Sequence, residues 1–353
     1  MRKAVNICKG IFISILMSSS AIAADETSKV IDDPAYTRAQ RLIEVEPGRK
    51  LNLYCLGEGT PTVIFVSGVA DDTSAWARVQ PAIAAHTRVC SYDRAGIGYS
   101  DAGRRPADSA NIVDDLHRLL NAASIKPPYI LVGHSMGGMH ARLYADSYLP
   151  EVAGMVLVDS VSETGQENAW RLDPQQPTHE HAFALDPKEL ANQRDCIKAA
   201  QLGFVEGSES YKMCVPPDDP RYSDAINASL HKAYMSLGFQ QAAISEQNTY
   251  QESSDEVRAA RRWYGDMPLI VLYAPLPARR DGETQAHRDA LDRVRLSFLD
   301  QLVALSKRGI VRLVPTATHE IQKSQPDAVI KAILEVLKDA REPKEHDPAA
   351  QHQ

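Results

Sequence analysis

The stretch from Tyr129 to Met139 constrains this chain most, because it joins a buried-strand pattern to a glycine-rich turn. Residues 129–132 are apolar or aromatic, a run typical of a strand and too short for a helix. Gly-X-Ser-X-Gly follows at 133–137, and apolar residues with helical spacing come next. A sharp strand-to-helix turn leaves no room for Cβ atoms beside its central residue, so glycines are needed there. The pattern therefore predicts a Ser135 hydroxyl exposed above the edge of a sheet.

Strand and helix patterns alternate through much of the chain. The first two strand patterns are separated by Pro47-Gly48 and predict an antiparallel hairpin. Because the later strands alternate with helices, we expect a mostly parallel sheet covered on both faces. A single helix capped by Asp72 or Thr73 is expected to carry Trp76, Val79 and Ile83. The eight strand patterns lie at 41–45, 50–55, 62–66, 88–92, 129–132, 154–158, 268–273 and 309–314.

Residues 160–265 interrupt this alternation. They contain proline-rich breaks and several helical patterns, and no strand pattern occurs among them. We expect a helical cap inserted into a core made of residues 40–159 and 266–340. Residues 341–353 are charged and polar, which predicts a disordered tail.

The N-terminal segment 1–24 has the features of a secretory signal. Arg2, Lys3 and Lys9 precede a short apolar stretch that ends in small residues. We expect cleavage after Ala23 or Ala24, export to the periplasm or the medium, and no membrane anchor after cleavage. The apolar run is too short to span a bilayer. The net charge is −7 and no basic run is present, so no nucleic-acid partner is expected.

A serine hydroxyl needs a base that takes its proton. Of the 11 histidines, His319 is the one that follows a predicted strand in a short loop, and we expect it to be the general base. A carboxylate is needed to orient the imidazole. Asp159 directly follows a predicted strand, whereas Asp281 lies in a loop further along the chain. A strand end fixes position better than a loop does, which favours Asp159 and leaves Asp281 as the alternative.

Backbone N–H groups are expected to stabilise the oxyanion that forms when Ser135 attacks a carbonyl. The candidates are the N–H of Met136, at the start of the helix, and that of Val69, in the loop after the strand at 62–66. No histidine or cysteine spacing indicates a metal, and the glycine-rich turn at 93–100 lacks the frame of a phosphate-binding motif. We therefore expect neither a metal nor an organic cofactor.

These motifs together resemble the α/β-hydrolase family. The resemblance covers about 42–337 apart from the cap, and it implies an eight-stranded, mostly parallel sheet flanked by helices. The family usually has His-Gly in the oxyanion loop, where this chain has Ser67 before Gly68. The matching segments are Ser67-Gly68-Val69, Asp93-Arg94-Ala-Gly96-Ile-Gly98-Tyr-Ser100, Gly133-His-Ser-Met-Gly137 and His319.

The resemblance also bears on the acid and on the cysteines. Many members of the family carry the acid soon after the penultimate strand, where this chain reads Ala274-Pro-Leu-Pro277. Some relatives, including haloalkane dehalogenases, carry it at the position that matches Asp159. The family's strand order makes the strands that hold Cys55 and Cys90 neighbours, which implies a disulfide between them. A second disulfide, Cys196–Cys214, is expected within the cap, with free thiols as the alternative for each pair.

From the signal segment and the resemblance together we expect an exported serine hydrolase, most simply a carboxylesterase that cleaves a small to medium ester through an acyl-enzyme. The alternatives are an amidase or peptidase, a cofactor-free haloperoxidase, and a binding module of the same fold without activity. Dehalogenase and epoxide hydrolase chemistry are disfavoured, because they need an attacking carboxylate where this chain has Ser135.

Overall fold

The computed structural model describes residues 29–164, 187–276, 278 and 283–342. The predicted signal segment 1–24 and Asp281 lie outside the described residues. So do residues 343–353, which make up nearly all of the predicted tail.

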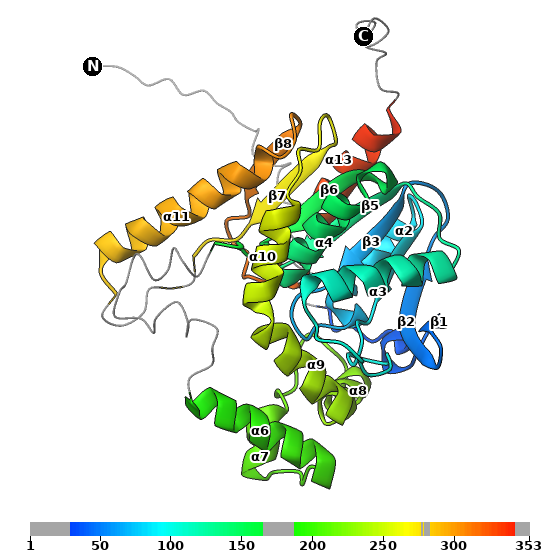
Figure 1. The fold of residues 1–353 in the computed structure, drawn as a ribbon, viewed down its shortest axis with the longest axis vertical. Coiled ribbons are helices and arrows are strands. Elements are labelled where there is room, and N and C mark those ends of the chain that lie inside the picture. Colours follow the sequence, from blue (N-terminus) through cyan, green and yellow to red (C-terminus); the bar gives the residue numbers. More distant parts are fainter. Residues whose placement is uncertain (1–28, 165–186, 277, 279–282, 343–353) are drawn as a thin grey trace, which may run out of the picture.

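Eight strands form one sheet, as predicted from the alternating patterns (Figure 1). Their order across the sheet is β1-β2-β4-β3-β5-β6-β7-β8. Strand β2 pairs antiparallel with both β1 and β4, and all the other pairs are parallel. The strands are β1 (Leu42–Glu46), β2 (Arg49–Leu56), β3 (Thr62–Val66), β4 (Val89–Tyr92), β5 (Tyr129–His134), β6 (Val152–Val158), β7 (Leu269–Tyr273) and β8 (Gly309–Leu313).

Helices cover both faces of the sheet, and alternate residues of each strand point to opposite faces. Leu131 of β5 packs in one core and its neighbours Ile130 and Val132 in the other, so the central strands are apolar on both sides. The first face carries α3 (Ser109–Ala122), α4 (Met136–Ser147), α10 (Tyr250–Ala260) and α11 (Gln285–Val303). The second carries η2 (Thr73–Trp76), α2 (Gln80–Ala84), α12 (Ile321–Ser324) and α13 (Pro326–Arg341).

The helix expected after Asp72 is divided into two short pieces, η2 and α2. Asp72 caps η2 by accepting a hydrogen bond from the N–H of Ser74 at 2.9 Å. The prediction of one continuous helix is wrong because Pro81 has no N–H and its ring would clash with the carbonyl four residues earlier. Trp76 is nevertheless fully buried, and its ring stacks on that of Phe65.

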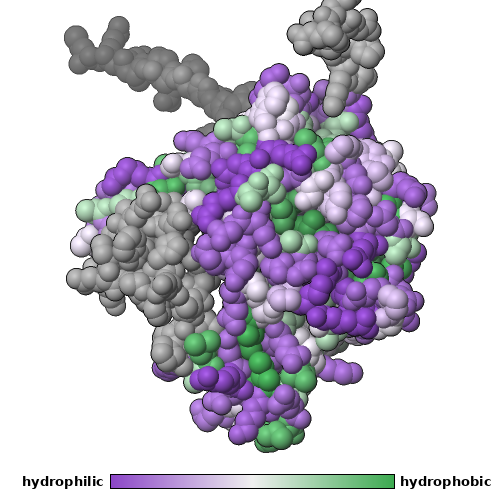
Figure 2. All heavy atoms as spheres, in the orientation of Figure 1, coloured by the Kyte–Doolittle hydropathy of each residue, from purple (hydrophilic) through white to green (hydrophobic). Residues whose placement is uncertain are grey.

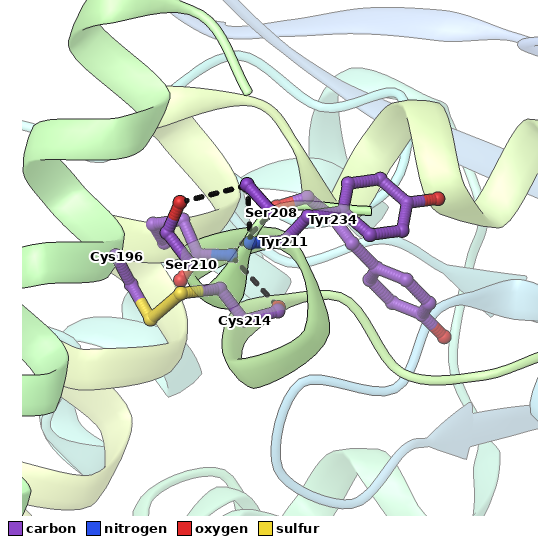
Figure 3. The surroundings of a disulfide bond; sticks show 7 residues. Cys196, Ser208, Ser210, Tyr211, Cys214 and Tyr234 are labelled. Carbon is purple, nitrogen blue, oxygen red and sulfur yellow. Dashed lines mark hydrogen bonds between the residues drawn. A yellow bond between two sulfur atoms is a disulfide. The ribbon is translucent and has the colours of Figure 1, made fainter. Parts of the chain in front are cut away.

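Most of the helices between β6 and β7 gather at one end of the molecule (Figure 1). Helix α10 lies instead along α3 and α4. Helix α7 had no counterpart in the sequence patterns, and the Cys196–Cys214 disulfide joins it to α6 (Figure 3). The gathered helices are α6 (Pro187–Leu202), α7 (Glu209–Cys214), α8 (Asp224–Tyr234) and α9 (Leu237–Asn248).

The face shown in Figure 2 is mostly hydrophilic, and hydrophobic residues gather at its lower end, over α6 and α7. Leu202 and Val205 are among the large apolar residues most exposed to solvent there. Within the described part of the chain, no helix combines the length and apolar character needed to cross a membrane.

Candidate active site

Ser135 lies at a strained turn between β5 and α4. Its φ of 52° falls in the left-handed region, which residues with a side chain rarely adopt. A Cβ atom at Gly133 would collide with the backbone of Gly137, and a Cβ atom at Gly137 would collide with the carbonyl oxygens of Val66 and Ser67. The two glycines therefore let α4 begin close against β3 and β5, with Ser135 at the apex.

The structure brings together two residues singled out from the sequence, His319 and Asp159. His319 follows β8, Asp159 follows β6, and His319 Nδ1 lies 2.7 Å from Asp159 Oδ2. The other carboxylate oxygen, Oδ1, accepts hydrogen bonds from the Ala274 N–H at 3.1 Å and from Arg295 Nη2 at 2.7 Å. Asp159 is thus held by three donors, and its φ of 42° marks a second strained position at a strand end.

The hydrogen bond between Asp159 and His319 shifts the pKa of both groups. Burial acts to raise the pKa of Asp159, but the hydrogen bond with His319 and the charge of Arg295 lower it below the ordinary value. The same hydrogen bond raises the pKa of His319 against the opposing effect of burial. The His319 side chain is 54% exposed and that of Asp159 only 12%, so the imidazole remains accessible while its partner is shielded.

His134, the residue before Ser135, contacts the loop that carries His319. The ring of His134 is buried, and its Nε2 lies 3.1 Å from the carbonyl oxygen of His319. The two imidazole rings have centroids 4.8 Å apart. His319 therefore lies at the same rim of the sheet as the serine turn.

Two backbone N–H groups at this rim are available as donors. Among the described residues, neither the N–H of Val69 nor that of Met136 has a hydrogen-bond partner. Ser67, which stands where the resembled family usually has histidine, accepts a hydrogen bond from Trp76 Nε1 at 2.9 Å through its hydroxyl. That contact ties the loop after β3 to η2.

Sequence reasoning missed Arg295, Glu246 and the part played by Arg94. Arg295 is one of many charged residues on α11 and Glu246 is one of several polar residues on α9, so the local sequence did not indicate that either has a charged partner far along the chain. Arg94 belongs to the glycine-rich motif at 93–100, but its pairing with Glu246 spans 152 positions of the chain.

Two cavities flank the rim. One of about 230 Å³ includes Asp71 and Glu320 in its lining and so adjoins the His319 loop. A larger one, of about 370 Å³, is lined by Arg94, Glu246 and residues of α3 and α9. Neither of these two cavities has Ser135 or His319 in its lining. In the part of the chain that the structure describes, no three His, Cys, Asp or Glu side chains gather so that they could hold a metal ion.

A mostly parallel eight-stranded sheet with a Gly-X-Ser-X-Gly turn after β5 defines the α/β-hydrolase fold. A family model described as "alpha/beta hydrolase fold" matches residues 61–201. The chain therefore has the α/β-hydrolase fold.

Individual relatives are distant. The chain is 25% identical to "Probable transporter efuK" of Hormonema carpetanum over 284 residues, which are 79% of this chain and 39% of that protein. It is 29% identical to 2-hydroxy-6-oxo-2,4-heptadienoate hydrolase of Pseudomonas putida over 202 residues, 52% of this chain and 70% of that protein. The solved bromoperoxidase of Bacillus anthracis has a TM-score of 0.55 at 17% identity, with 85% of this chain and 99% of that one covered. The matches to the first four curated relatives span 16% to 51% of those proteins' lengths.

Proposed function

We propose that this protein is an exported serine hydrolase, most simply a carboxylesterase, with Ser135 as nucleophile, His319 as general base and Asp159 as the acid that orients His319. The observation that carries the proposal is the 2.7 Å contact between His319 Nδ1 and Asp159 Oδ2, at the rim where the strained Ser135 turn lies. The α/β-hydrolase fold supports hydrolase chemistry in general, and specificity for esters is the part that we add.

In this proposal the Ser135 hydroxyl attacks the carbonyl carbon of an ester, and its proton passes to Nε2 of His319. The oxyanion accepts hydrogen bonds from the N–H groups of Val69 and Met136. The tetrahedral intermediate expels the alcohol, which takes the proton from His319 and leaves an acyl group on Ser135. Water then attacks by the same steps, releases the carboxylic acid and restores the serine.

The disulfides support one part of this proposal, the export. The Cys55–Cys90 and Cys196–Cys214 disulfides are of a kind that persists in oxidising compartments, which agrees with export directed by residues 1–24. N-terminal sequencing of protein recovered outside the cytoplasm should start at residue 24 or 25, and recovery of a chain that still begins at Met1 would contradict export.

Labelling with a fluorophosphonate probe tests the nucleophile. Wild type should be labelled and should hydrolyse p-nitrophenyl esters, whereas Ser135→Ala should lose labelling and lose turnover on the order of 10⁶-fold. Ser147→Ala removes a solvent-exposed serine at the other end of α4 and should match wild type. An unlabelled, inactive wild type would favour the binding-module alternative, and faster cleavage of matched anilides than of esters would favour the amidase.

A further inference from the structure

A buried ion pair joins α9 to the turn after β4. Glu246 lies on α9 and Arg94 in the turn after β4, and their side chains are 2% and 3% exposed. Arg94 Nε donates to Glu246 Oε1 at 2.6 Å, and Arg94 Nη2 donates to Oε2 at 3.0 Å. Two parallel bonds between a guanidinium and a carboxylate fix direction as well as distance.

The same two side chains hold the backbone of the loop after β3. Arg94 Nη1 donates to the carbonyl of Ser67 at 2.8 Å, and Nη2 donates to that of Gly68 at 2.6 Å. Glu246 Oε2 accepts the N–H of Ala70 at 2.9 Å. The polar groups on either side of Val69 are therefore occupied, while its own N–H has no partner among the described residues.

The direction of the Val69 N–H follows from the planarity of the peptide bond. In a trans peptide, the carbonyl of Gly68 and the N–H of Val69 point in opposite directions. Because Arg94 holds that carbonyl, the N–H of Val69 points away from Arg94. A Cβ atom at Gly68 would lie 2.8 Å from Nδ1 of His134, so the loop also packs against the residue before Ser135.

Stability alone is a weak reason to bury such a pair, because the cost of desolvating two charges offsets much of their attraction. The five hydrogen bonds do specify one orientation of the loop.

We propose that Glu246 is a positioning residue that the cap contributes to the active site. Through Arg94 it holds the Val69 N–H in the orientation an oxyanion needs, so that docking of α9 on the core completes the oxyanion hole. This inference rests on the proposed function. An oxyanion is present in the transition state and absent from the bound ester, so loss of the contact lowers kcat and leaves KM for a short ester nearly unchanged.

The test compares Glu246→Gln with Glu252→Gln, the same substitution at an exposed position on α10, in the full-length protein. Glu246→Gln should lower kcat for p-nitrophenyl acetate about 100-fold, which is the loss typical when a group that acts in the transition state, here the Val69 N–H, is displaced. The KM should stay within about 3-fold of the wild-type value. A trifluoromethyl ketone forms a tetrahedral oxyanion on the serine, and its inhibition constant should rise by a similar factor. Glu252→Gln should change neither quantity.

Circular dichroism shows whether the variants are folded. Glu246→Asp keeps the charge next to Arg94 but is too short to hold Arg94 and the Ala70 N–H together, so it should give an intermediate loss of kcat even where Glu246→Gln does not fold. The proposal is overturned if folded Glu246→Asp keeps the wild-type kcat, if the loss falls on KM, or if ketone inhibition is unchanged.

Different results would contradict the proposed hydrolase function and the positioning role of Glu246. If wild type is labelled by fluorophosphonate and folded Glu246→Gln turns over equally fast, the positioning role alone is wrong. If wild type is neither labelled nor active, the proposed function is wrong and the positioning role falls with it.

Discussion

Replacing Asp159 with Asn tests the proposed acid, and the structure determines how the amide would be oriented. The N–H of Ala274 and Nη2 of Arg295 both donate to Oδ1, at 3.1 and 2.7 Å. In Asp159→Asn the amide oxygen must therefore take the place of Oδ1, because only an acceptor satisfies both donors. The amide NH₂ then faces Nδ1 of His319.

An NH₂ group facing Nδ1 forces the wrong tautomer on His319. Nδ1 must then accept a hydrogen bond, so the ring proton moves to Nε2, which can no longer take the proton of Ser135. The carboxylate that stabilises the imidazolium is lost as well. A change of this kind costs about 10⁴-fold in kcat, or about 5.4 kcal/mol of barrier.

The assay is kcat for p-nitrophenyl acetate near pH 8, with the rate of fluorophosphonate labelling as a second readout. Asp281→Asn, at the alternative acid considered from the sequence, is the matched control and should stay within about 2-fold of wild type, because this assignment gives Asp281 no part in the reaction. A folded Asp159→Asn enzyme within 10-fold of wild type, or a large loss in Asp281→Asn, would refute the assignment.

Three further predictions concern the Asp159–His319 contact and the Cys55–Cys90 disulfide. Because Asp159 raises the pKa of His319, kcat/KM should fall on the acid side with a midpoint above the ordinary value of 6.5. Arg295→Met removes a positive charge that offsets the carboxylate, so the pKa of His319 should rise further, and a pH–rate profile whose midpoint moves down instead would contradict this. The Cys55–Cys90 disulfide closes a separation of 35 residues, so Cys55→Ser/Cys90→Ser should lose about 3–4 kcal/mol of unfolding free energy. Urea denaturation would measure it, and an unchanged midpoint would count against the bond.

The pairing of Cys55 with Cys90 was predicted from the family resemblance and not from the hydrophobic pattern. The family's strand order implied that Cys55 and Cys90 lie on adjacent strands, and in the structure they are direct partners in the β2–β4 register, joined by a bond. The hydrophobic pattern alone identified both strands but not their pairing. Pairing depends on which strands lie side by side, and no local pattern records that.

The sequence by itself determined the strands, the serine turn and the placement of Asp159 and His319, because each depends on local signals: apolar runs, glycines without Cβ atoms, and the ends of strands. The prediction of one continuous helix after Asp72 was wrong, because Pro81 at the start of α2 interrupts a pattern that otherwise favours one helix.

Tertiary structure alone decided what surrounds those residues. Arg295 reaches Asp159 across 136 positions and Glu246 reaches Arg94 across 152. A charged residue on a helix has the same local pattern whether it faces solvent or a buried partner, so the folded arrangement of α9 and α11 was needed to tell these two from the rest.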